Sequence, residues 1–156
     1  MKNLQFKQLL LLSDTQKKAN QFLFQKRFNL ITADDNSVGK STLAKLLLWT
    51  FGCEPDFDST WKSTDCKCLV DFSIDGTNYK ILRYQNFISL KEENQEILKY
   101  TNIGGDYSKK FAELVDFKVL LPKRGSDETE LVTPPPAYYF LPFYMDQKNS
   151  WSKTWN

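Results

Sequence analysis

The residues best suited to chemistry stand together between positions 34 and 42. The end of this run, Gly39-Lys40-Ser41, is typical of a phosphate-binding loop. In such a loop, backbone N–H groups at a helix start surround the phosphates of a nucleotide. We expect Lys40 to reach the β- and γ-phosphates of the nucleotide and Ser41 to hold Mg²⁺. The residues predicted to contact the nucleotide are Asp34, Asp35, Asn36, Ser37, Val38, Gly39, Lys40, Ser41 and Thr42.

Asp34 departs from the pattern, which has glycine five residues before Gly39. Glycine serves there because the chain turns sharply and comes close to the phosphates. Aspartate tolerates a left-handed backbone better than most residues, but it brings a negative charge towards an anion. Two alternatives follow: a loop that still binds nucleotide tightly, and a loop whose affinity is weakened.

The elements around the loop favour a true phosphate site over a chance Gly-Lys-Ser. An apolar segment, residues 28–32, precedes it and is predicted to be a strand. An apolar helix is predicted to begin near Gly39 and to end by Gly52, with Pro55 confirming the break. A Gly-Lys-Ser sequence indicates a phosphate-binding loop when it stands between a strand and a helix in this order. Further strands are predicted upstream, over residues 4–12 and 21–25.

Downstream of the helix the sequence predicts an antiparallel β region over about residues 66–100. Alternation of apolar and polar residues over 66–74 and 77–84 flanks Asp75-Gly76, a strong hairpin signal. A helix is expected over residues 107–117, and an aromatic segment, 138–147, is expected to end in a buried strand. The predicted fold class is therefore α/β: a P-loop NTPase lobe with a phosphate-loop strand and helix and an antiparallel β subdomain.

Composition narrows the classes of function. The 156 residues are 41% hydrophobic and 15% aromatic, enough for a core, and the net charge is only +2. The chain has no histidine, which excludes His-based acid–base catalysis and His-containing zinc sites within it. Cys66 and Cys68 would share one face of a strand, where we interpret them as buried thiols. No segment approaches the ~20 apolar residues of a membrane span, so a cytoplasmic protein without membrane contact is expected.

Two nucleotide-binding classes fit poorly. A small GTPase would carry Asp-x-x-Gly after the hairpin, but residues 82–86 read Leu-Arg-Tyr-Gln-Asn, and Asn-Lys-x-Asp is absent from the sequence. A small nucleotide kinase would need a lid of arginines, whereas this chain has three, Arg27, Arg83 and Arg124.

The order of these features resembles the N-terminal half of ATPase heads of the SMC, RecN and RecF type, a branch of the ABC ATPases. Strands precede the loop, an antiparallel subdomain follows its helix, and a predicted strand end carries Gln147 roughly a hundred residues beyond Lys40. The resemblance implies that Gln147 is the Q-loop residue, in contact with Mg²⁺ and the attacking water. In the same resemblance, Asn36 stands where many such loops carry the asparagine of a Gly-x-Asn sequence. Thr42 stands where a hydroxyl contacts the α-phosphate.

The resemblance implies that residues 1–156 form an ATP-binding lobe that hydrolyses ATP once a C-terminal lobe completes it and two heads dimerise. DNA repair, chromosome handling or defence against foreign DNA would be its setting. The second half of such heads carries Leu-Ser-Gly-Gly and a strand ending Asp-Glu, and this sequence has neither, so the chain alone is expected to lack turnover. The alternative is a non-catalytic or truncated lobe that binds a partner half.

Partners are expected to include the C-terminal lobe or a second head, and DNA is a further candidate partner. The basic pairs at 109–110 and 123–124 could contact phosphates in a salt-dependent way. Interleaved acidic residues favour the alternative, a solvated charged face.

Overall fold

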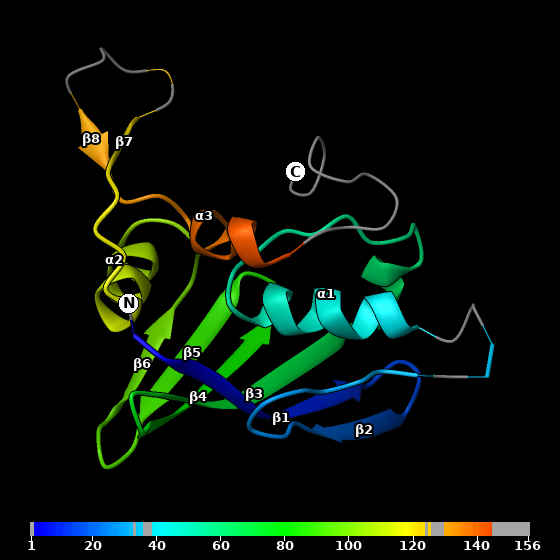
Figure 1. Cartoon of the computed structure of the whole chain (residues 1–156). Helices are drawn as coiled ribbons and strands as arrows, with labels where there is room; N and C mark the ends of the chain where they lie inside the picture. Colours follow the sequence, from blue (N-terminus) through cyan, green and yellow to red (C-terminus); the bar gives the residue numbers. More distant parts are fainter. Residues whose placement is uncertain (1, 33, 36–38, 124, 126–129, 145–156) are drawn as a thin grey trace.

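The computed structural model describes residues 2–32, 34–35, 39–123, 125 and 130–144. Its centre is a six-stranded sheet in the order β2-β1-β3-β4-β5-β6, and every pair of neighbours is antiparallel. Figure 1 shows the sheet below helices α1 and α2. The strands are β1 (Leu4–Ser13), β2 (Lys18–Leu23), β3 (Cys66–Ile74), β4 (Thr77–Tyr84), β5 (Phe87–Glu92) and β6 (Ile97–Tyr100). The remaining elements are α1 (Lys40–Thr50), the 3-10 turn η1 (Trp61–Thr64), α2 (Asp106–Val115), β7 (Leu121–Pro122), β8 (Leu131–Val132), α3 (Ala137–Phe140) and the 3-10 turn η2 (Leu141–Phe143).

The hairpin between β3 and β4 forms where alternation and Asp75-Gly76 predicted it. Ile74 pairs with Thr77 across the turn, and the register continues to Lys67 opposite Tyr84. The period-two pattern sends alternate residues to opposite faces, so one face of these strands can be buried. The strand predictions for residues 66–74 and 77–84 are confirmed.

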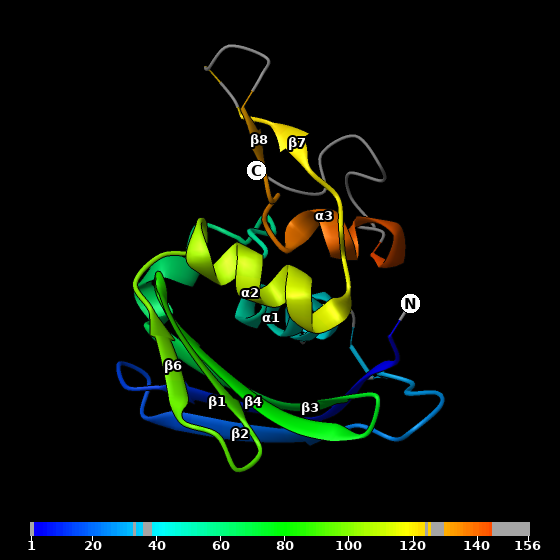
Figure 2. The ribbon, with the colours of Figure 1, turned by 90° about the vertical axis from the view of Figure 1, so that its left-hand side faces the viewer.

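Both long helices cover one face of the sheet. Figure 2 shows the sheet in profile with α1 and α2 on the same side and α3 beyond them. The core between sheet and helices centres on Phe51, which follows α1 and is fully buried. Its ring lies 4.9 Å from that of Phe72 on β3 and 5.6 Å from that of Phe140 on α3. This aromatic cluster joins the sheet, the end of α1 and α3, and so fixes the position of α1 over the sheet.

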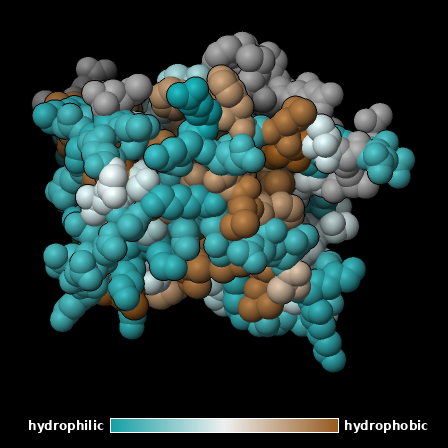
Figure 3. Space-filling view, turned by 60° about the horizontal axis from the view of Figure 1, so that its bottom comes forward, coloured by the Kyte–Doolittle hydropathy of each residue, from teal (hydrophilic) through white to brown (hydrophobic). Residues whose placement is uncertain are grey.

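The opposite face of the sheet carries leucines as well. Leu10, Leu12, Leu69 and Leu82 line a shallow groove there, and Leu12 is 43% exposed. The space-filling view in Figure 3 shows apolar surface between hydrophilic regions.

One sequence prediction about an element is wrong. Residues 28–32 form no strand in the described part of the chain, and Phe28 and Leu30 are 89% and 88% exposed. An apolar segment becomes a strand only when a neighbouring strand pairs with it, and here β2 ends at Leu23. Residues 137–143 of the aromatic segment are helical, after Pro136, whose fixed φ suits a helix start. The strand predicted at the end of this segment, towards residue 147, lies outside the described residues.

None of the helices described is long and apolar enough to cross a membrane.

Candidate phosphate-binding site

The candidate site lies at the start of α1. Gly39 has φ +86°, a left-handed conformation that glycine adopts without the Cβ penalty of other residues. Lys40 is the first residue of the helix, and the amide of Leu43 donates to the Gly39 carbonyl at 2.9 Å. Its first turn contains no acidic residue, and among the described residues no side chain caps it. The helix start therefore retains N–H groups and a positive dipole end suited to an anion.

Lys40 folds back over the loop. Its Nζ donates to the backbone carbonyl of Asp35 at 2.7 Å, so the ammonium lies over the chain that leads into the helix. Asp34 and Asp35 are exposed, as is Ser41 in the first turn, and Thr42 is half-buried. The predicted contacts Asn36, Ser37 and Val38 lie outside the described residues, as does Gln147.

A groove of about 620 Å³ opens beside the first turn of α1. Thr42 is the residue of the predicted phosphate loop that lines it. The opposite walls come from the β1–β2 turn, with Lys17 and Lys18, and from η1, with Trp61. Asp58 lines the groove as well, so the two lysines leave it with a net positive lining. With the helix N-terminus and the Trp61 ring beside them, they favour an anionic, partly apolar ligand.

The far end of α1 is anchored by Arg83, which sequence reasoning did not single out. Arg83 is 1% exposed, and its guanidinium donates to the carbonyls of Trp49 at 2.5 Å and Cys53 at 3.0 Å. It also pairs with Glu54 and lies 4.2 Å from the Trp49 ring. Burial lowers the pKa of Arg83, and the Glu54 carboxylate opposes that shift. A charged group among the last carbonyls of a helix neutralises its negative end, so Arg83 holds α1 onto β4.

A signal for Arg83 exists in the sequence, although it is weak. Arg83 occupies an inward position in the alternation of β4, where Tyr79 and Ile81 are buried. A charge at such a position indicates a buried partner. The identity of that partner, the end of α1, is set by the tertiary fold.

The lysines considered for DNA contact have acidic neighbours. Lys109 lies 3.9 Å from Asp106, and Lys123 lies 2.9 Å from Glu130. Arg124 lies outside the described residues. These pairs agree with the solvated charged face that the sequence favoured.

The comparisons with known proteins add one relationship. No family model matches the chain. The chain is similar to Lamassu protein LmuB of Bacillus cereus (strain VD014), with 24% identity over 152 residues that make up 97% of this chain and 26% of the relative. It is also similar to Lamassu protein LmuB of Bacillus sp. (strain NCIM 5461 / CCTCC AB 2011126 / NIO-1130), with 27% identity over 86% of this chain and 23% of that protein. The chain thus spans about a quarter of the length of the curated relatives that it matches.

Proposed function

We propose that this chain is the ATP-binding N-terminal lobe of an SMC-like ATPase that acts in defence against foreign DNA, in the manner of an anti-phage system. One observation carries the proposal: Lys40 opens α1 directly after left-handed Gly39, and its ammonium lies over the loop. That is the arrangement by which a lysine and a helix start hold the phosphates of a nucleotide. Similarity to Lamassu proteins over nearly the whole chain supports the defence setting.

The residues at the helix start fit a magnesium nucleotide. Lys40 would bind the terminal phosphates, and the exposed hydroxyl of Ser41 would bind Mg²⁺. Bound Mg²⁺ would supply charge neutralisation at the phosphates. The adjoining groove, with Lys17, Lys18 and Trp61, offers room for the rest of the nucleotide. Hydrolysis would require the completing lobe and a second head, with Gln147 as the predicted contact to Mg²⁺ and water.

Equilibrium titration of the 156-residue chain with MgATP tests the proposal. Lys40→Ala should weaken binding about tenfold or more, because a hydrogen bond to a charged group is worth ~1.5–3 kcal/mol. Lys109→Ala is the matched control: it removes the same charge from an exposed position of α2 and should leave affinity unchanged. Equal affinities for the wild type and the Lys40→Ala variant would overturn the site assignment.

A second function is favoured by a different observation. Phe28 and Leu30 lie almost fully exposed just before the loop, and Asp34 replaces the usual glycine. Exposed large apolar side chains in a cluster are typical of surfaces that another protein covers. A non-catalytic lobe that binds a partner half would show both features. A folded wild-type chain that binds no MgATP would favour this interaction role.

A further inference from the structure

Two thiols lie side by side at the edge of the groove beside α1. The Sγ atoms of Cys66 and Cys68 are 3.7 Å apart on the inner face of β3. Cys68 is fully buried, whereas Cys66 is half-buried and lines both the groove beside α1 and a second groove that contains Trp49 and Arg83. A solvent-borne reagent can therefore reach one thiol of the pair and not the other.

The two thiols differ in acidity in a way that suits stepwise oxidation. A hydrogen bond from Cys68 lowers the pKa of the Cys66 thiol. The same hydrogen bond and burial raise the pKa of Cys68. Because the thiolate is the nucleophile in thiol chemistry, Cys66 is the attacking group and Cys68 the resolving one.

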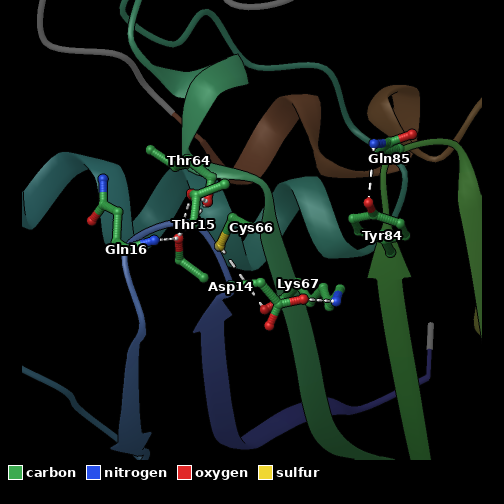
Figure 4. A network of polar contacts seen from close by, with 9 residues as sticks. Asp14, Thr15, Gln16, Thr64, Cys66, Lys67, Tyr84 and Gln85 are labelled. Atoms are coloured by element: carbon green, nitrogen blue, oxygen red, sulfur yellow. Dashed lines mark hydrogen bonds and ion pairs between the residues drawn. The ribbon is translucent and has the colours of Figure 1, made fainter.

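The backbone around Cys66 can adjust to bring the sulfurs together. Two residues of extended strand span about 6.6 Å between Cα atoms, near the upper limit of ~6.8 Å for a disulfide. Cys66 is the first residue of β3 and follows Asp65, whose φ is +45°. It pairs with Ser13 of β1, whereas β4 joins β3 from Lys67 onward. Figure 4 shows Cys66 at this strand end, beside Thr15 of the β1–β2 turn and Thr64 of η1. Closing the pair would therefore disturb one end of one ladder.

We propose that Cys66 and Cys68 form a reversible modification site that closes to an intrachain disulfide when the protein meets a small-molecule disulfide. The Cys66 thiolate attacks one sulfur of the reagent, breaks its S–S bond and releases one thiolate. Cys68 then attacks Cys66 Sγ, passes its proton to the departing sulfur and releases the second reagent thiol. The protein is oxidised by two electrons and two reagent thiols are formed.

Closure would have a local structural effect. It would draw Cys66 towards Cys68 and away from Ser13, whose hydroxyl donates to the Thr64 carbonyl at the end of η1. Because Thr64 and Cys66 both line the groove beside α1, oxidation would reshape that groove. A disulfide strained by an extended strand is easily reduced, so the modification should be reversible.

Treatment of the native chain with oxidised glutathione, followed by alkylation and intact-mass and peptide mass spectrometry, tests the proposal. We expect the loss of two hydrogens, a Cys66–Cys68 cross-link and full reversal by dithiothreitol. Cys53→Ser should oxidise in the same way, whereas Cys66→Ser should give no cross-link. A stable glutathione adduct on Cys66 without closure, a cross-link to Cys53, or no reaction in the folded chain would each overturn the proposal.

Discussion

Replacing Arg83 with methionine tests how firmly the helix of the candidate site is held. Methionine keeps much of the unbranched stem but removes every donor of the guanidinium. The buried Cys53 carbonyl then loses its donor at 3.0 Å, whereas the Trp49 carbonyl loses the guanidinium at 2.5 Å but still accepts from the Gly52 amide at 2.9 Å. An unsatisfied buried carbonyl costs ~1–3 kcal/mol, the lost bond to Trp49 ~1 kcal/mol, and the contact with the Trp49 ring adds up to ~1 kcal/mol.

Removing the guanidinium also recovers the free energy spent on burying it. Taking this offset into account, we expect Arg83→Met to lower the free energy of unfolding by about 2 kcal/mol. For a chain of this size that corresponds to a fall in Tm of about 4–8 °C. Urea unfolding at pH 7, followed by tryptophan fluorescence with a check that the m-value is unchanged, measures it.

Glu54→Gln is the matched control for Arg83→Met. The Glu54 side chain is 51% exposed, so losing its ion pair should cost no more than ~1 kcal/mol. If Arg83→Met unfolds within ~1 kcal/mol of the wild type, or if Glu54→Gln is as destabilised as Arg83→Met, the carbonyl contacts do not hold α1 and the reasoning fails.

Two further predictions concern the same core. Gly52→Ala should lower the free energy of unfolding by more than ~2 kcal/mol, because φ is +94° and a Cβ would meet Ile103 Cγ2 at 2.9 Å and Tyr107 Cε1 at 3.0 Å. Gly76→Ala, with φ +90° and nothing within 4 Å, is the control for strain alone and should cost ~1 kcal/mol by the same urea assay. Tyr107 is fully buried and donates to the Phe51 carbonyl at 2.8 Å, and burial raises its pKa well above 10. Tyr107→Phe should therefore cost ~1–2 kcal/mol at pH 7 by urea unfolding.

The sign of the pH effect at Tyr107 follows from that raised pKa. Above pH ~10 the unfolded chain loses the tyrosine proton while the folded chain keeps it, so wild-type stability falls as pH rises. Tyr107→Phe lacks this contribution, so its deficit relative to the wild type should shrink between pH 9 and pH 11 in the same assay. If the free energies of unfolding of the wild type and Tyr107→Phe change in parallel with pH, the raised pKa of Tyr107 is contradicted. Equal losses of stability for Gly52→Ala and Gly76→Ala would contradict the steric argument at Gly52.

Local signals were enough for several elements. Asp75-Gly76 between alternating segments predicted the β3–β4 hairpin, and Gly39 with Gly52 predicted both ends of α1. These signals work because turn glycines and strand alternation depend on neighbouring residues alone. The class of protein, an SMC-like ATPase, stays a prediction. It rests on the phosphate loop and on similarity to the Lamassu proteins.

The sequence by itself determined the chemistry at the start of α1: a glycine, a lysine and two hydroxyl residues in consecutive positions. It also determined that Cys66 and Cys68 share a face of β3. Only the tertiary structure decided that residues 28–32 remain outside the sheet, that residues 137–143 are helical and that Arg83 is buried against α1. The physical reason is that strand pairing and the burial of a charge depend on partners distant in the chain.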